Sequence, residues 1–147
     1  MQNAITELEE ITLTSGAKNF LRETAKWGKF LSILGFIALG LMLMGSFFIG
    51  AFYNTTPQAD IMPFDLGIVV TLIYIVVALI YIFPIYYLYQ FSAKMKEALI
   101  SKDDAVLVTA FEMLKSHYKF IGVFTIITVS IYLLIATSAV MGGLGAL

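Results

Sequence analysis

The sequence predicts an all-α integral membrane protein: a bundle of three transmembrane helices with an N-terminal amphipathic interfacial helix and a cytoplasmic helical hairpin. Of the 147 residues, 60% are hydrophobic and 13% are charged, whereas a soluble domain is roughly half apolar and a quarter charged. Mean hydropathy is +0.91, and three long stretches carry no charged residue. This composition excludes a soluble enzyme and a disordered tail.

The three uncharged stretches are long enough to cross a bilayer as helices. Residues 30–53 and 66–89 form stretches of 24 residues each, and 120–141 form one of 22. At ~1.5 Å per residue they span roughly 33–36 Å, against a hydrocarbon core of about 30 Å. Backbone amides find no water in lipid, so each stretch must be helical. The first stretch is too long for a cleaved signal peptide, and we expect it to remain as a span.

The basic residues predict the orientation of these spans. The nine Lys and Arg residues all precede the first span or lie between the second and the third. They are Lys18, Arg22, Lys26, Lys29, Lys94, Lys96, Lys102, Lys115 and Lys119. The loop 54–65 and the tail 142–147 contain none, and short loops rich in Lys and Arg stay in the cytoplasm. We therefore expect a cytoplasmic N-terminus, with the loop, the tail and the C-terminus outside.

The segment 1–29 precedes the first span and contains two parts. Residues 1–13 are acidic, and Thr6 with Glu9 could form a capping box on a short helix. From Ser15 a cationic stripe and an apolar stripe recur at helical spacing, which favours a helix in the inner headgroup layer. The residues expected to contact lipid headgroups are Lys18, Arg22, Lys26, Trp27 and Lys29. A bend at Gly28 would lead into the span, and one long helix with a solvated cationic end is the alternative.

The segment 90–119 is predicted to form a cytoplasmic hairpin of two helical arms. Each arm presents apolar residues at helical spacing, and the residues from Ser101 to Asp104 resemble a turn with a capping box between them. The two stripes are Phe91, Met95 and Leu99, and Leu107, Phe111, Leu114 and Tyr118. Such a hairpin would project roughly 15–20 Å from the membrane. It could dock a cytoplasmic partner or simply pack its own stripes together.

Residues able to carry chemistry are scarce, and we expect no enzyme activity, catalytic residue, metal or cofactor. None of the spans contains Asp, Glu, Lys, Arg or His, whereas proton relays and ion-coupled carriers place such groups at membrane depth. His117 is the one histidine, and no second metal ligand lies one helical turn away, so we interpret it as an interfacial or hairpin side chain. The chain has no Cys, which excludes disulfides and thiolate chemistry.

Small and hydroxyl residues in the spans are interpreted as helix-packing positions. Small residues allow close backbone approach, and hydroxyls can bond across helices. The residues expected to pack helices are Ser46, Gly50, Tyr74, Pro84, Thr128, Tyr132, Ser138 and Gly142. These positions could close on one another within the chain or seat against another subunit. Pro84 should kink the second span and leave the carbonyl of Ile80 without a donor.

Three segments together resemble a family of small bacterial membrane proteins of unknown function. They are KWGKFLSILGFI at the first span, IYIFPIYYLYQFS at the end of the second and FEMLKSHYKFIG before the third. The resemblance covers nearly the whole chain after residue 15. It implies a bacterial protein of the inner membrane, and it implies no activity or site residues.

The functional expectation is a non-catalytic inner-membrane protein, an accessory or scaffold subunit of a larger membrane complex. The chain has ample helix-packing surface and no recognisable chemistry, which favours this interpretation. The alternative is a homo-oligomeric channel or transport component lined by the hydroxyl faces. Expected partners are the lipid bilayer and another membrane subunit or a second copy. We expect no nucleic acid and identify no small-molecule substrate.

Overall fold

The protein is a set of three long helices in the computed structural model, which describes residues 13–57 and 63–144. The helices are α2 (Ser15–Tyr53), α3 (Leu66–Ser101) and α4 (Asp104–Leu144). All three are long and apolar enough to cross a membrane. The predicted all-helical fold with three candidate spans is therefore confirmed. The acidic segment 1–13 falls almost wholly outside the described residues.

Helix α2 is continuous from the cationic segment into the first apolar stretch. The Thr14 hydroxyl caps its start by accepting from the amide of Ala17 at 3.3 Å, and its end is capped by Asn54. The helix passes through Gly28 without a break, so the cationic segment from Ser15 and the first apolar stretch belong to one continuous helix. Gly28 is buried against Ser92, Leu88 and Phe91 of α3. This contact keeps the glycine in the helical conformation.

Helix α3 extends well beyond the second apolar stretch. The Asp65 carboxylate caps its start by accepting from the amide of Ile68 at 2.9 Å. The helix continues through Pro84 to Ser101, where Lys102 adopts a left-handed conformation with φ 56°. A residue in this conformation ends a helix, because the next residue can no longer continue the i→i−4 ladder.

Asp103 directly precedes α4 and caps its start. Its Oδ1 atom accepts from the amides of Ala105 at 2.8 Å and Val106 at 3.3 Å. The predicted cap at Ser101 is wrong, since Ser101 is the last residue of α3 and its hydroxyl donates to the Glu97 carbonyl at 2.9 Å. The physical reason is that Lys102 ends α3 after Ser101, which leaves Asp103 next to the free amides of α4.

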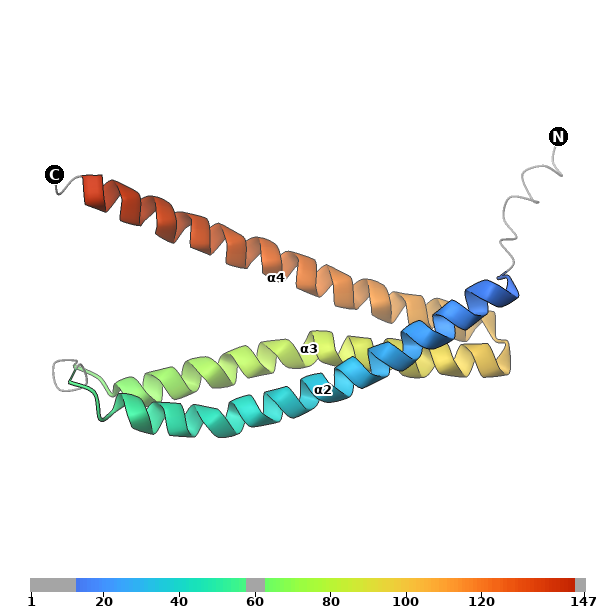
Figure 1. Ribbon diagram of the computed structural model, residues 1–147, viewed down its shortest axis with the longest axis horizontal. Coiled ribbons are helices and arrows are strands. Elements are labelled where there is room, and N and C mark those ends of the chain that lie inside the picture. The colour runs from blue at the N-terminus through green and yellow to red at the C-terminus, as the bar shows by residue number, and fades with distance from the viewer. Residues whose placement is uncertain (1–12, 58–62, 145–147) are drawn as a thin grey trace.

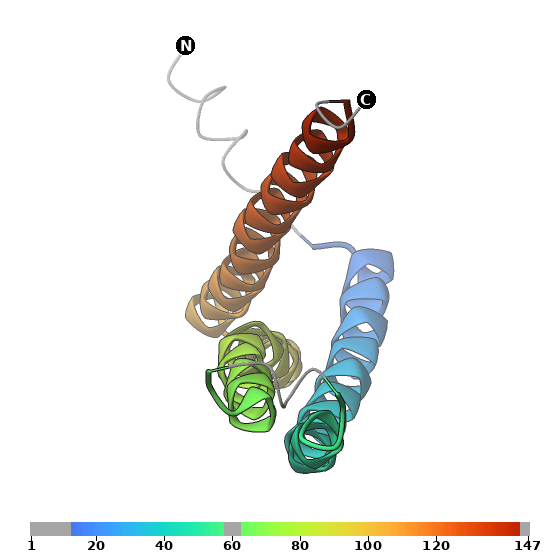
Figure 2. The same cartoon turned by 90° about the vertical axis from the view of Figure 1, so that its left-hand side faces the viewer.

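The helices are arranged with α3 between its two neighbours (Figures 1 and 2). Helices α2 and α3 run side by side, and α4 packs on α3 near the turn at Lys102 before it diverges toward its C-terminal end (Figure 1). We call the end of the molecule at this turn the Lys102 end, and the opposite end, where α2 and α3 are joined, the Asn54 end. Within the described residues, α2 and α4 make no close backbone approach to each other.

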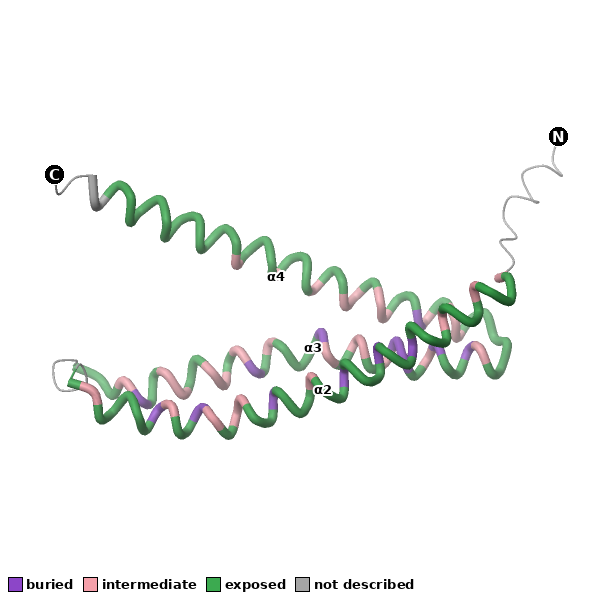
Figure 3. Tube along the Cα trace, viewed as in Figure 1, coloured by how far each residue is buried: buried purple, intermediate pink, exposed green. Residues whose placement is uncertain are grey.

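The hydrophobic core lies at the Lys102 end and joins all three helices. Ala25 of α2, Phe91 and Met95 of α3 and Ala110 of α4 are buried together. Partly buried apolar residues surround them: Leu21, Leu88, Leu99, Leu107, Met113 and Leu114. From Val129 to Met141 of α4, by contrast, every residue is exposed, and this length of the tube is green (Figure 3). The molecule thus packs tightly where its chain leaves the apolar stretches.

The predicted apolar stripe of α4 is only partly right. Leu107 and Leu114 border the core, but Phe111 is 43% exposed and Tyr118 is 66% exposed. Ala110 takes the central position instead and is fully buried. A small side chain lets the backbones of α3 and α4 approach closely, and this rotates the larger aromatic residues away from the contact.

Candidate functional site

The contact between α2 and α3 at the Asn54 end depends on two glycines. A methyl group added at Gly50 would meet the Thr71 hydroxyl and, at 2.7 Å, the carbonyl oxygen of Gly67. A methyl group at Gly67 would meet the Gly50 carbonyl and the Asn54 side chain. Only glycine permits such an approach of two helix backbones. The predicted packing residue Gly50 therefore lies in a contact between the helices, and Gly67 is a partner that the sequence interpretation missed.

Two hydrogen bonds cross this same contact. The Thr71 hydroxyl donates to the Ser46 carbonyl at 3.2 Å, and the Gly67 amide donates to the Asn54 side-chain oxygen at 2.8 Å. Ser46 itself is fully buried, with its hydroxyl donating to the Leu43 carbonyl of its own helix. These bonds fix the register of α2 against α3 where the connecting loop begins.

Five of the eight serine and threonine hydroxyls in the apolar stretches bond within their own helix. The Thr71 hydroxyl bonds across to α2, whereas the hydroxyls of Ser46 and Ser138, two of the predicted packing residues, donate within their own helices. The hydroxyls that donate to carbonyls three or four residues earlier include those of Ser32, Ser46, Ser130, Thr137 and Ser138. The carbonyls of the preceding turn are always within reach of a Ser or Thr side chain in a helix, so this bond forms without a second helix.

His117 connects α4 to α3 at Pro84. Its Nδ1 atom lies 2.7 Å from the Pro84 carbonyl oxygen, and because a carbonyl only accepts, Nδ1 must carry the proton in this contact. Pro84 is buried and lies within the continuous helix α3. The predicted site residue Pro84 therefore has a partner 33 positions away, and the interfacial interpretation of His117 gave no sign of this contact.

Replacement of His117 should distinguish this hydrogen bond from simple packing. In His117→Asn the amide nitrogen is as many bonds from Cα as Nδ1, so the bond to Pro84 can be kept. In His117→Phe it is lost, and the free energy of unfolding should fall by about 1 kcal/mol. Equilibrium unfolding in mixed micelles measures the difference between the two variants. Equal losses in Asn and Phe variants would contradict a role for the Nδ1 proton.

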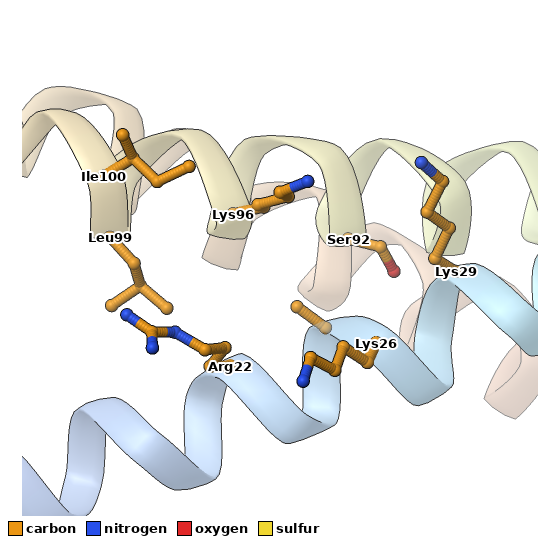
Figure 4. A pocket seen from close by; sticks show the side chains of 8 residues that line it. Arg22, Lys26, Lys29, Ser92, Lys96, Leu99 and Ile100 are labelled. Carbon is orange, nitrogen blue, oxygen red and sulfur yellow. The ribbon is translucent and has the colours of Figure 1, made fainter.

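A cleft between α2 and α3 at the Lys102 end gathers cationic side chains. Arg22, Lys26 and Lys29 come from α2, and Lys96 comes from α3 (Figure 4). The cleft has a volume of about 340 Å³, and Ala25 and Leu99 contribute to its apolar wall. Three of the residues predicted to contact lipid headgroups therefore share one cleft, and Lys96 is an additional member.

The other predicted site residues lie apart from this cleft. Trp27 is 65% exposed and Lys18 is exposed on α2. Tyr74 and Thr128 are partly buried, whereas Tyr132 is 66% exposed and Ser138 is exposed. Gly142 belongs to α4, but its surroundings lie outside the described side chains.

The described residues contain no group of three or more His, Asp or Glu side chains that could hold a metal ion. No protein-family model, curated protein or solved structure matches this chain. The fold and the composition define a helical protein whose three long apolar helices are compatible with a multi-pass membrane protein. Function must therefore be argued from the surfaces and clefts of the molecule itself.

Proposed function

We propose that the protein is a non-catalytic integral membrane protein that serves as an accessory or scaffold subunit of a larger membrane complex, with α4 as its docking helix. The observation that carries this proposal is the separation of α4 from the rest of the molecule. From Val129 to Met141 every residue of α4 is exposed, and the helix diverges from α3 over this length (Figure 1). At ~1.5 Å per residue this is roughly 20 Å of helix surface.

The chemistry of this exposed surface supports a protein partner. Tyr132 lies near the middle of the third apolar stretch, and no hydrogen bond in the described part of the chain engages its hydroxyl. A tyrosine hydroxyl in an apolar environment normally finds a partner. Ala136, Ser138 and Ala139 follow within two turns, and such small residues allow another helix to approach closely.

Two aromatic contacts between α3 and α4 lie shortly before the exposed length of α4, and a partner helix would enter beside them. The rings of Tyr81 and Phe124 meet edge to face at 5.3 Å, and those of Phe83 and Phe120 stack at 6.3 Å. A shallow open cleft of about 480 Å³ lies beside them, between Tyr87 and Ile127. A neighbouring helix could begin its contact in this cleft and continue along the exposed surface of α4.

A photo-crosslinking amino acid at Tyr132 tests the docking role in native membranes. We expect a discrete product with one partner subunit, and we expect none from the same probe at Phe48, a residue of α2 that is 74% exposed. Replacing Ala136 with leucine should abolish the Tyr132 product, because a larger side chain keeps the partner helix away. A product of twice the mass of this chain would indicate the homo-oligomer instead. No discrete product from Tyr132 would refute the docking proposal.

The proposed address is the bacterial inner membrane, with the Lys102 end in the cytoplasm. The start of α2 lies at the same end of the molecule as the end of α3 and the start of α4 (Figure 1). These segments, with the turn at Lys102, carry all nine Lys and Arg residues. The positive-inside rule and the resemblance noted above support this orientation. Alkaline phosphatase fused after Leu147 should be active, and green fluorescent protein at the same position should be dark. The reverse pattern would contradict the orientation.

A further inference from the structure

The cationic cleft owes its shape to the way α2 and α3 cross. The helices touch at Gly28, where an added methyl group would collide with the Ser92 side chain. From this point toward Arg22 and Leu99 they separate and leave a wedge between them (Figure 4). Ala25 is 5% exposed on the side of α2 that faces the core, so its small side chain leaves the wedge open.

The charges in the cleft lack a counter-ion within the described part of the chain. Lys94 and Glu97 form the one ion pair there, at 3.0 Å, and neither residue lines the cleft. The Ser92 hydroxyl is occupied, because it donates to the Leu88 carbonyl at 2.9 Å. The surface of the cleft itself is almost wholly apolar, because Arg22, Lys26, Lys29 and Lys96 line it mainly with the carbon atoms of their side chains. Their charged ends, one guanidinium and three ammonium groups, are exposed and are all donors.

The position of the cleft favours a ligand that belongs to the membrane. Lys29 directly precedes the first apolar stretch, and Ser92 lies three residues beyond the second. The cleft therefore begins at the boundary of the hydrocarbon core and extends into the headgroup layer. Basic pockets between membrane helices on the cytoplasmic side suit acidic lipid headgroups, since phosphate oxygens accept from several cationic donors at once.

We propose that this cleft is a binding site for one anionic phospholipid, whose headgroup phosphate lies among Arg22, Lys26, Lys29 and Lys96. The apolar parts of the wall, at Ala25, Leu99 and Ile100, contact the uncharged part of the headgroup. Two helices contribute to the site, so the lipid also joins the start of α2 to the end of α3. The site is independent of the docking role of α4, whose exposed surface lies toward the other end of the molecule.

Native mass spectrometry of the full chain in detergent measures this binding with two lipids, phosphatidylglycerol and phosphatidylcholine. The double variant Arg22→Gln/Lys96→Gln should bind phosphatidylglycerol about 25-fold more weakly, at about fivefold per cation. The control is Lys115→Gln/Lys119→Gln, which removes the same charge from exposed positions of α4 and should stay within about twofold of the unchanged chain. Phosphatidylcholine should bind weakly to every variant.

Three results would overturn the site. Equal losses in the two double variants would mean that lipid is attracted by net charge alone. Displacement of phosphatidylglycerol by millimolar inorganic phosphate would assign the cleft to a free phosphate. The triple variant Glu7→Gln/Glu9→Gln/Glu10→Gln should leave the affinity unchanged, and a tenfold gain would mean that the acidic segment of this chain is the occupant.

Discussion

Replacing Phe91 with alanine should lower the free energy of unfolding by about 3–5 kcal/mol. Phe91 is 1% exposed and packs with Ala25, Met95 and Ala110 in a cluster that joins α2, α3 and α4. This cluster lies beyond the uncharged stretches, where the surrounding medium contains water and burial of apolar surface stabilises the fold. Loss of the ring leaves a cavity among the three helices, and the helices can move only partly into it.

Titration with sodium dodecyl sulfate in mixed micelles gives the free energy of unfolding for this comparison. Phe111→Ala is the matched control, because Phe111 is of the same residue type at the same end of the molecule but is 43% exposed. The control should lose at most about 1 kcal/mol. Similar losses in the two variants would show that the cluster around Phe91 does not hold the helices together.

The existence and the class of the helices were predictable because lipid imposes a simple requirement. A segment that crosses the bilayer must satisfy its own backbone and must be long and apolar, so uncharged length alone locates it. The stretches at 30–53, 66–89 and 120–141 all lie inside the observed helices. The end of α3 and the start of α4 were harder to place to the residue, because the turn at Lys102 depends on one residue in a left-handed conformation.

The contacts between helices were less predictable, because close approach of two helix backbones selects small residues, and hydrophobicity alone does not single these out. The choice of Phe111 for the stripe of α4 followed hydrophobicity, and the structure buries Ala110 instead. Likewise, Gly50 was predicted as a helix-packing residue, but no sequence pattern around Gly67 indicates that it packs against Gly50. Small residues become informative only when the helix that faces them is known.

The candidate site was predictable only in part, because its residues come from two helices whose contact the sequence does not show. The cations of α2 were predicted to contact headgroups from their spacing along one helix, and three of them line the cleft. Lys96 joins them from a helix 67 positions later in the chain than Lys29, and no pattern within either segment indicates that the two face one cleft. The bond from His117 to Pro84 is a similar case, since both residues were noted and their pairing depends on how α4 packs on α3.

Replacing Gly67 with alanine should separate α2 from α3 at the Asn54 end and cost about 2–3 kcal/mol. The added methyl group meets the Gly50 carbonyl and the Asn54 side chain. The carbonyl is part of a helix backbone and cannot move alone, so the whole end of α2 must shift. This shift also weakens the bonds from the Gly67 amide to Asn54 and from the Thr71 hydroxyl to Ser46.

Two measurements test this prediction against Gly40→Ala, a control in which the new methyl group meets nothing within 4 Å. Alanine favours helix over glycine by up to about 1 kcal/mol, so the control should be as stable as the unchanged chain or slightly more stable. The chain has no Cys, so spin labels can be attached specifically at introduced cysteines in place of Phe52 and Ile68, which are 67% and 58% exposed. The distance between the labels should increase in Gly67→Ala and remain unchanged in Gly40→Ala. An unchanged distance together with unchanged stability would show that α2 and α3 do not require glycine at this contact, and the register derived from Gly50 and Gly67 would then be wrong.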